Sequence, residues 1–520
     1  MHENREISSA PSASCEGRSV KAPSRTTDTY ALEKSDCAVV PMNQSNKEAQ
    51  TSTETGEGRA QTKENTVQSH MPPTQSGTRM SQGLHGVRRA ASGRKQERFT
   101  ALLHHLSVAF LRDSFYALKR QASPGVDGMT WQEYETGLGD RINDLHRRVH
   151  RGAYRARPSR RVYIPKADGR QRPLGIAALE DKIVQQAVVT VLNQIYETDF
   201  KGFSYGFRSG RSPHQALDAL TVGIQRKRVN WVLDADIRGF FDNMSHEWTM
   251  KFIQHRVADR RMLRLIQKWL KAGVSEDGQW SETKLGTPQG AVVSPLLANV
   301  YLHYVFDLWA EAWRKKVARG EVIVVRYADD LVLGFQHRAD AERFLTEFRE
   351  RLVRFGLELH PDKTRLIEFG RFAVRNRKQR GEGKPETFTF LGLTHFCGNL
   401  TSSGAFNVWR ITAKKRMVAK LNVVKTELQY RKHHRTSEVG AWLRKVAQGY
   451  YQYHAVPGNT SQLRVFRRRV CRLWRSVLVR RSQRAQVGWD RLNPLFTRWI
   501  PHPRVLHPYP DKRFDAIHPR

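Results

Sequence analysis

The sequence is poor in cysteine and has no long apolar run. Its four cysteines, Cys15, Cys37, Cys397 and Cys471, include no C-x-x-C pair. A zinc ribbon, a zinc knuckle and a disulfide framework are therefore not expected, and a reducing cytoplasm fits this usage. No apolar stretch approaches the roughly 20 residues of a membrane span, and the N-terminus has no apolar signal-peptide core, so we expect no membrane partner.

Residues 1–96 have very few aromatic side chains and no sustained apolar period. The stretch is rich in Ser, Thr, Gly, Gln and Glu. Such a composition buries too little apolar surface to offset the entropy lost on ordering the chain. We therefore predict that residues 1–96 form a disordered tail.

Acidic residues are scarce relative to basic ones. Lys plus Arg number 88 against 50 Asp plus Glu, which gives a formal net charge of +38. This excess predicts a polyanionic partner such as RNA or DNA, because neutralising phosphates releases counterions. A basic protein of the membrane surface is the alternative, and it is disfavoured because the charge is spread over loops and helices instead of one short anchor. The length of 520 residues suggests two or three domains.

Apolar periodicity predicts helices and strands that alternate through the middle of the chain. Helices are expected at 99–110, at 181–196, from Pro213 onward after an N-cap at Ser212, and throughout 411–484. Strands are expected at 161–166, 171–176 and 231–237, and on both sides of the turn within 322–335. The proline-containing segment from residue 499 on is expected to be irregular.

Carboxylates occur where an apolar strand should exclude them. Asp234 and Asp236 share one face of the predicted strand, because side chains alternate along a strand. Asp329 and Asp330 occupy a predicted hairpin tip. An unpaired buried carboxylate is costly, and a hard cation such as Mg²⁺ resolves that cost. A pair of such ions, roughly 3.5–4 Å apart, activates a 3′-hydroxyl and stabilises leaving pyrophosphate. The alternative for the adjacent pair is an ordinary turn, where aspartate is common.

Five segments then occur in the order typical of one family. They lie at 236–242, 286–295, 327–330, 360–364 and 390–393. Over roughly residues 120–400 the chain resembles reverse transcriptases, which are RNA-directed DNA polymerases. The resemblance implies an α+β right-hand fold, with fingers and a palm built on a small antiparallel sheet over 97–400. A helical thumb or maturase domain would follow at 401–485, and a basic, proline-containing segment at 486–520.

The resemblance assigns the catalytic residues by position. Asp236, Asp329 and Asp330 resemble the catalytic carboxylates of the family. Asp236 and Asp329 would be the main ligands of two Mg²⁺ ions, with Asp330 and the backbone carbonyl of Ile237 as further ligands. Asp234 is the rival of Asp236, but the spacing to Gly239 favours Asp236, and a salt bridge or cap explains Asp234.

The nucleotide-binding residues also follow from the resemblance. Phe240 resembles the aromatic residue beneath the sugar of the incoming nucleotide, which predicts use of dNTPs and argues against an RNA-dependent RNA polymerase. Core packing is the alternative for Phe240. Lys166 and Arg172 flank the predicted hairpin and could grip the triphosphate. Gln289 would touch the nucleotide or template, and Lys363 either assists the leaving pyrophosphate or is a surface lysine.

Three further segments are similar to bacterial group II intron-encoded proteins. They lie at 123–128, 203–212 and 449–459. The similarity implies a cytoplasmic ribonucleoprotein that binds its intron RNA, promotes splicing, and moves by target-primed reverse transcription into DNA. No paired-cysteine HNH endonuclease motif follows the helical region, so priming from a replication fork or another nick is expected. The alternatives are a retron or defence-system reverse transcriptase, and an RNA-binding maturase that only assists splicing.

The helical region carries a basic stripe. Its members recur at three- and four-residue spacing and are Arg464, Arg467, Arg468, Arg472 and Arg475. On a helix these arginines would share a face and contact RNA phosphates. For the interleaved aromatic residues, a place in the thumb core is favoured over stacking on RNA bases.

Overall fold

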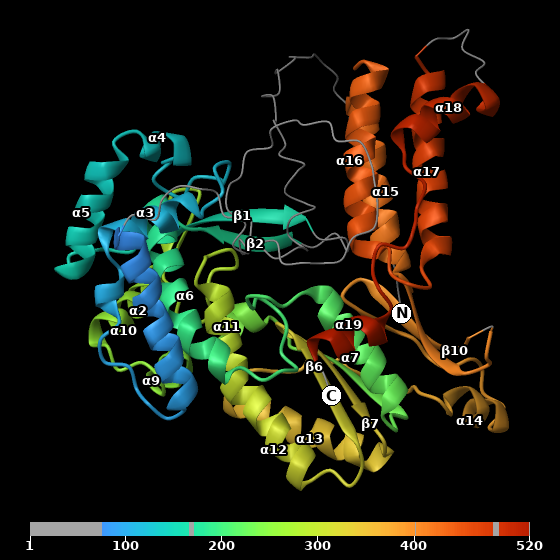
Figure 1. Ribbon diagram of the computed structural model, residues 1–520, viewed down its shortest axis with the longest axis horizontal. Coiled ribbons are helices and arrows are strands. Elements are labelled where there is room, and N and C mark those ends of the chain that lie inside the picture. Colours follow the sequence, from blue (N-terminus) through green and yellow to red (C-terminus); the bar gives the residue numbers. More distant parts are fainter. Residues whose placement is uncertain (1–74, 166–170, 401, 482–487, 519–520) are drawn as a thin grey trace, which may run out of the picture.

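The computed structural model describes residues 75–165, 171–400, 402–481 and 488–518 (Figure 1). Within these ranges the strands form three small sheets, and helices surround them. Residues 1–74 of the predicted tail, the expected turn at 167–170 and Lys166 lie outside the described residues. The mixed α and β architecture with small, largely antiparallel sheets agrees with the predicted fold class.

A helical unit precedes and flanks the central sheet. Its helices are α2 (Gln75–Gly93), η1 (Leu103–His105), α3 (Val108–Tyr116), α4 (Trp131–Glu135), α5 (Leu138–His150), α6 (Leu179–Asp199), α9 (His246–Gln254) and α10 (Arg260–Lys271). The predicted helix at 181–196 is confirmed as α6, which is apolar and buried along most of its length. Because α6 contacts α2 and α3 on one side and α11 (Ser294–Leu302) on another, it lies at the centre of the unit.

The predicted disordered tail ends too late, because residues 75–93 form α2. Val87 and Ala91 of this helix are buried against the main core. The guanidinium group of Arg256 donates hydrogen bonds to the carbonyls of Ala91 (3.2 Å) and Arg94 (3.0 Å) at the C-terminal end of α2. The last carbonyls of a helix have no hydrogen-bond donor within the helix. Arg256, which is distant in the sequence, supplies these hydrogen bonds to α2.

The single helix expected at 99–110 is also replaced by two elements, η1 and α3. The backbone amides of Leu102 and Leu103 donate to one carboxylate oxygen of Asp259, at 2.8 and 2.9 Å. This contact fixes a bend before Ser107, whose hydroxyl caps α3. The apolar spacing therefore indicates burial correctly, but the prediction of one continuous helix is wrong.

The first sheet contains the predicted hairpin and has the strand order β2-β1-β4-β5. Its strands are β1 (Ser159–Pro165), β2 (Gln171–Ile176), β4 (Val274–Glu276) and β5 (Gln279–Ser281). β1 and β2 pair antiparallel as predicted, and β4 pairs parallel to β1. This sheet joins the N-terminal hairpin to the segment that leads into residues 286–295.

The central sheet has the order β6-β7-β3-β8, and all its neighbours are antiparallel. Its strands are β3 (Trp231–Asp236), β6 (Val322–Tyr327), β7 (Asp330–Phe335) and β8 (Arg365–Glu368). Val232 and Val332 face the cluster that contains α7 (Pro213–Arg226), whereas Leu233 and Leu333 face the main core. Side chains alternate between the two faces, so both faces of this sheet are covered.

Further helices and a third sheet complete the middle of the chain. They are π-helix η2 (His303–Asp307), α12 (Leu308–Lys316), α13 (Arg338–Arg354), α14 (Ala373–Gln379), β9 (Phe388–Phe390), β10 (Leu393–Asn399) and β11 (Phe406–Thr412). β11 pairs with β10 along its whole length. The helical region therefore begins at Lys414 and not at the predicted residue 401.

The helices that follow have an apolar core of their own, separate from the main core. They are α15 (Lys414–Tyr430), α16 (Thr436–His454), α17 (Thr460–Val479) and α18 (Trp489–Trp499). Figure 1 shows them standing beside the sheets, on the side opposite to α5.

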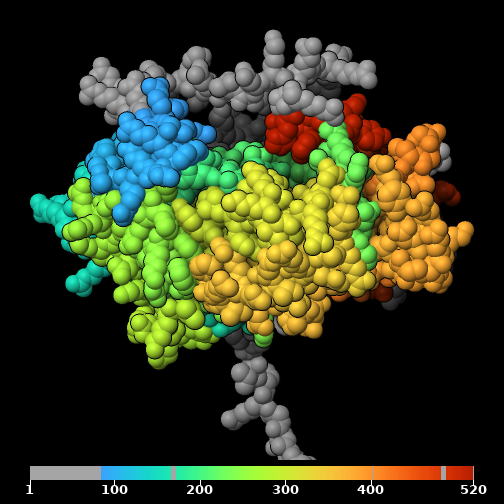
Figure 2. Space-filling model, turned by 90° about the horizontal axis from the view of Figure 1, so that it is seen from below, coloured from blue at the N-terminus to red at the C-terminus, as the bar shows by residue number. Residues whose placement is uncertain are grey.

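The end of the chain is not irregular throughout, as the sequence had suggested. Residues Pro510–Ile517 form α19, which packs on α7, and α7 in turn contacts β6 of the central sheet. In Figure 2 the red C-terminal residues lie against a green part of the surface. Arg226 of α7 pairs with Asp515 at 2.7 Å, and Arg513 pairs with the buried Asp218 at 3.1 Å. These long-range ion pairs hold a short helix that its own sequence would not stabilise. In the described part of the chain, no helix is long and apolar enough to cross a membrane.

Candidate active site

Two strand ends bring three carboxylates together. Asp236 ends β3, Asp330 begins β7, and the two residues are direct partners in the antiparallel ladder. Directly opposite residues project on the same side of a sheet. Asp236 and Asp330 therefore continue the face that carries Val232 and Val332, and Asp329 lies in the turn beside them.

The turn that carries Asp329 is tight and strained. Tyr327 pairs with Asp330, which leaves only Ala328 and Asp329 between the strands. Ala328 is buried and has φ +56°, a left-handed value that a residue with a Cβ rarely adopts. Gly206 lies against this turn so closely that a Cβ atom on it would be 2.2 Å from the Ala328 nitrogen. The surrounding structure therefore dictates the backbone that aims Asp329.

The carboxylates raise one another's affinity for protons. Burial and then the charge of Asp236 raise the pKa of Asp329, while the charge of Arg172 opposes this shift. Burial and the charges of Asp329 and Asp236 raise the pKa of Asp330. One side of Asp330 is open to solvent, so we attribute its shift more to crowding of negative charge than to burial. Lys363 partly relieves this crowding with an ammonium group 2.6 Å from Asp236.

The arrangement fits a metal site that substrate completes. Among the described residues, no three acidic, histidine or cysteine side chains are close enough to enclose a metal ion. In phosphoryl-transfer sites Mg²⁺ is usually bound by one or two carboxylates, and water and substrate phosphates fill its other positions. Asp236 and Asp329, which interact electrostatically at the end of the sheet, could provide the carboxylates for such a site.

Comparison with known proteins identifies the family. Residues 164–395 match the family model described as reverse transcriptase (RNA-dependent DNA polymerase). Protein YkfC of Escherichia coli (strain K12) is 34% identical over 299 residues, which cover 50% of this chain and 78% of YkfC. The chain belongs to the reverse transcriptase family.

Relatives named for introns narrow the relationship further. Group II intron-encoded protein LtrA of Lactococcus lactis is 42% identical over 165 residues, which cover 32% of this reverse transcriptase and 27% of LtrA. Nuclear intron maturase 1 of Arabidopsis thaliana is 29% identical over 92 residues, which cover 18% of this chain and 13% of the maturase. The predicted resemblance to group II intron reverse transcriptases is confirmed, although the match to LtrA spans only about a quarter of that protein.

Two of the nucleotide-binding residues expected in this reverse transcriptase, Arg172 and Gln289, are connected through β2. Arg172 lies on β2, and its charge reaches Asp329. The loop of Gln289 is fixed to the same strand, because the Gly175 amide donates to the Gln289 carbonyl at 2.7 Å. Gly290 has φ +111°, and a Cβ atom there would lie 3.0 Å from the Gly175 carbonyl oxygen.

Ile237, the expected carbonyl ligand, follows Asp236 directly and has a buried side chain. The amide of the next residue, Arg238, donates to the Glu358 carbonyl at 2.8 Å. This hydrogen bond holds the backbone in place just after β3, beside the carboxylates.

Phe240 does not lie where the resemblance suggested. Its ring is 2% exposed and packs edge-on against Tyr301, with ring centroids 6.1 Å apart. Core packing, the alternative considered for Phe240, therefore accounts for its position. The next residue, Phe241, is only partly buried, and its carbonyl accepts from the Thr287 amide of the loop that carries Gln289. The turn into the short helix α8 (Phe240–Asn243) starts at Gly239 with φ +54°, and this bend decides which ring turns inward.

Asp234 is paired as expected for a structural residue. A guanidinium nitrogen of Arg365 on β8 lies 3.8 Å from its carboxylate. Burial raises the pKa of Asp234 to about 6, and the charge of Arg365 opposes that shift. Asp236 is paired as well, with Lys363 at 2.6 Å, so the choice of Asp236 as the functional residue stays a prediction.

The predicted basic stripe on α17 divides into two groups. Arg464, Arg468 and Arg472 are exposed at four-residue spacing. Arg467 instead donates to the Ile500 carbonyl at 3.1 Å, and the Arg475 guanidinium carbon lies 5.2 Å from the ring centroid of Trp489. Arg467 and Arg475 therefore hold α18 and the residue that follows it in place.

Sequence reasoning missed Arg416, a cation on the first turn of α15. Its charge partly opposes the rise in the pKa of Asp330 that burial and the neighbouring carboxylates cause, and its side chain lies against Gly392. The local signal was only a run of basic residues at 414–416 before an apolar helix. The proximity to Asp330 depends on how the helical region packs against the central sheet.

Proposed function

We propose that this reverse transcriptase copies RNA into DNA at Asp236 and Asp329, with two Mg²⁺ ions. The observation that carries this proposal is the pairing of Asp236 with Asp330 at adjacent strand ends, with Asp329 in the strained turn between β6 and β7. The family match over residues 164–395 supports the same chemistry.

Each neighbouring side chain has a distinct role in the proposal. Bound Mg²⁺ would make the primer 3′-hydroxyl a better nucleophile and neutralise the leaving pyrophosphate. Lys363 balances the charge of Asp236 until substrate arrives, because its ammonium group lies 2.6 Å away. Arg172 binds the triphosphate where negative charge develops. Phe241, the partly exposed ring, packs beneath the sugar and excludes a 2′-hydroxyl.

The elements divide naturally into the parts of a right hand. The helical unit and the β1–β2 hairpin serve as fingers, the central sheet as palm, and α15–α18 as thumb. In Figure 1 the hairpin and the thumb helices stand on two sides of the central sheet, an arrangement suited to hold a template and primer between them.

We further propose that the protein binds a group II intron RNA and promotes its splicing and mobility. The similarity to LtrA and to an intron maturase supports this partner. The exposed cations Arg464, Arg468 and Arg472 on α17 supply a surface for RNA phosphates. The carboxylates favour a polymerase over a protein that only assists splicing.

Primer extension on an RNA template tests the polymerase. Asp236→Asn and Asp329→Asn each reduce DNA synthesis by about 10²–10³-fold or more, because each removes charge from the reacting centre. Filter binding shows that RNA affinity is kept. If RNA binding fell in parallel with DNA synthesis, the carboxylates would be structural and the proposed active site would be wrong.

Splicing at low Mg²⁺ tests the RNA partner. A transcript of the gene's own locus is incubated with and without the purified protein. Exon joining that depends on the protein supports the intron partner. Absence of splicing with folded, RNA-binding protein would move the assignment toward reverse transcriptases that do not serve introns.

A further inference from the structure

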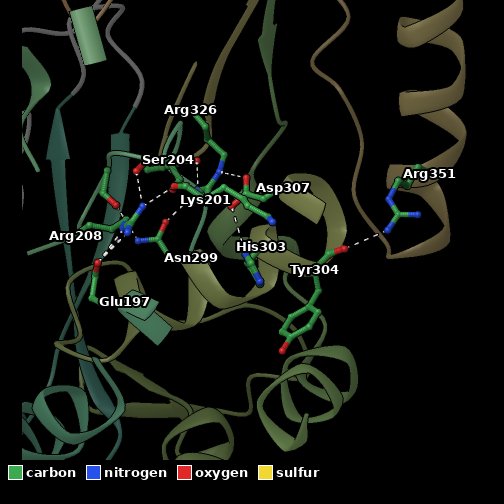
Figure 3. A network of polar contacts seen from close by, with 12 residues as sticks. Glu197, Lys201, Ser204, Arg208, Asn299, His303, Tyr304, Asp307, Arg326 and Arg351 are labelled. Carbon is green, nitrogen blue, oxygen red and sulfur yellow. Dashed lines mark hydrogen bonds and ion pairs between the residues drawn. The ribbon is translucent and has the colours of Figure 1, made fainter. Parts of the chain in front are cut away.

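A fully buried ion pair lies directly behind the turn that carries Asp329. Arg326 on β6 and Asp307 at the end of η2 are both 0% exposed at their side chains. Arg326 donates two hydrogen bonds to the carboxylate, Nε to Oδ1 at 2.7 Å and Nη2 to Oδ2 at 2.6 Å (Figure 3). A buried pair of this kind rarely stabilises a fold more than apolar residues would, so we expect a role other than stability.

The remaining nitrogen of Arg326 reaches the turn itself. Nη1 donates to the Ala328 carbonyl at 3.1 Å and to Oδ1 of Asn299 on α11 at 3.0 Å. Ala328 is the residue with left-handed backbone and immediately precedes Asp329. One guanidinium group therefore ties the strained residue of the turn to α11 and to η2.

The position of Asp307 depends on a local irregularity in the helix. Residues His303–Asp307 form a π-helical turn between α11 and α12, and such turns occur frequently at functional sites. Because an extra residue fits into the turn, side chains beyond it are rotated relative to a regular helix. Arg351 of α13 donates to the Tyr304 carbonyl at 3.1 Å and also to the Val305 carbonyl, so a second arginine satisfies groups of this turn (Figure 3).

The loop at 203–208 supports the turn from the other side. The Arg326 amide donates to the Phe203 carbonyl at 2.9 Å, and the Tyr205 amide donates to the Arg326 carbonyl at 2.8 Å. Nδ2 of Asn299 donates to the Gly206 carbonyl at 2.8 Å, and Gly206 contacts the Ala328 amide. Part of the segment 203–212, singled out by its resemblance to intron proteins, thus packs against the catalytic turn.

We propose that Arg326, fixed by Asp307 and Asn299, is a positioning residue that sets the direction of the Asp329 carboxylate by holding the Ala328 carbonyl. The inference rests on the proposed role of Asp329 as a metal ligand. It assigns a purpose to the buried pair, because a misaligned carboxylate loses metal affinity and turnover while the fold remains intact.

The main test replaces the pair with apolar residues of similar size in the variant Arg326→Met/Asp307→Leu. Neither member of the pair is left as an unpaired charge, so we expect the fold to be preserved. His303 Nδ1, which lies 3.8 Å from the Asp307 carboxylate, also loses this neighbour in the variant. The control is Arg410→Met/Asp218→Leu/Arg513→Met, which removes a buried pair joined at 2.7 Å between β11 and α7 together with Arg513, the second arginine, 3.1 Å from Asp218. Circular dichroism and thermal unfolding measure the fold, and Mn²⁺ titration by electron paramagnetic resonance measures metal binding without turnover.

We expect the variant of Arg326 to bind Mn²⁺ about tenfold more weakly and to lose about 10²-fold in kcat. KM for dNTP changes by less than about threefold, because the groups that bind the triphosphate are untouched. The control retains wild-type Mn²⁺ affinity and kcat. A folded variant of Arg326 that matched this control in both properties would overturn the proposal.

Arg326→Lys provides a second test if the double variant fails to fold. Lysine keeps a cation beside Asp307 but cannot also reach the Ala328 carbonyl with a second arm. We expect the same direction of change in Mn²⁺ affinity and kcat, and wild-type values for both would refute the positioning role. The proposed function fails separately, if the wild-type protein binds Mn²⁺ but does not extend a primer on RNA.

Discussion

The ammonium group of Lys363 and the carboxylate of Asp236 form an ion pair 2.6 Å long, at the end of the central sheet. Lys363 follows the segment at 360–362, whose His360 amide donates to the Asp236 carbonyl at 2.8 Å. The hydrogen bond of His360 therefore holds the segment that carries Lys363 beside Asp236. The ammonium group lies where a metal cation would bind the Asp236 carboxylate.

This relationship predicts competition between the lysine and the metal. Lys363→Gln binds Mn²⁺ more tightly than wild type in the absence of nucleotide, by about two- to tenfold, because a repelling cation is removed. DNA synthesis falls, because the same cation no longer assists the leaving pyrophosphate. Lys251→Gln, which breaks an exposed pair with Glu247 of the same 2.6 Å length, is the control and changes neither quantity. Weaker Mn²⁺ binding by Lys363→Gln would contradict the competition.

The adjacent rings Phe240 and Phe241 predict opposite consequences of substitution. Phe241→Val raises the ratio of rNTP to dNTP incorporation, measured as kcat/KM, by roughly tenfold or more. It lowers the free energy of unfolding less than Phe240→Ala does, since the Phe241 ring is only partly buried against the main core. Phe240→Ala lowers the free energy of unfolding by about 3–5 kcal/mol, because its ring is buried against Tyr301. Relaxed sugar selection in a mild Phe240→Leu variant, but not in Phe241→Val, would restore the original assignment to Phe240.

Buried histidines predict a loss of stability in mild acid. His395 is 0% exposed and stacks on Phe388, and burial followed by the charge of Arg410 lowers its pKa to about 3. A histidine with a depressed folded-state pKa contributes stability above its unfolded pKa of about 6.5, and that contribution is lost as pH falls below this value. Between pH 7.5 and pH 5 the loss amounts to about 2 kcal/mol for this group.

Urea unfolding at these pH values measures this effect. Burial likewise lowers the pKa of His454 to about 3, so the loss is shared. His395→Phe keeps the stacking on Phe388 and makes the dependence of unfolding free energy on pH less steep. A slope equal to that of the wild type would show that His395 is not the source.

The divided stripe on α17 predicts two classes of arginine. Replacing Arg464, Arg468 and Arg472 together by glutamine weakens RNA binding and lowers the slope of log affinity against log salt by about one unit for each phosphate that is no longer neutralised. The unfolding temperature is unchanged, because these side chains are exposed. Arg467→Gln and Arg475→Gln instead lower the unfolding temperature, since they no longer bind the Ile500 carbonyl and the Trp489 ring. Equal effects of both classes on RNA affinity would contradict the division.

Much of the central region could be predicted from the sequence because its signals are local. The alternating residues of 231–236, the hairpin at 322–335 and the apolar stripe of α6 specify their elements through periodicity and turn chemistry. The order of the motif segments then identified the reverse transcriptase family and predicted that Asp236 and Asp329 share one site. The roles of these carboxylates remain predictions for the experiments described above.

Other features were decided only when distant elements packed together. Arg256 supplies the C-terminal partners of α2, and Asp259 interrupts the expected helix before α3. The choice between Phe240 and Phe241, and the division of the α17 arginines, depend on which side of an element faces a core.

The sequence by itself determined the main elements of the central region, the family and the candidate carboxylates, because periodicity, turn residues and ordered motifs are properties of neighbouring positions. Only the tertiary structure decided that Arg326 contacts Asp307 and the Ala328 carbonyl. Asp307 ends a π-helical turn that the local sequence pattern did not predict. The physical reason is that burial and hydrogen-bond partners are set by residues far apart along the chain, and these become neighbours only when the elements pack.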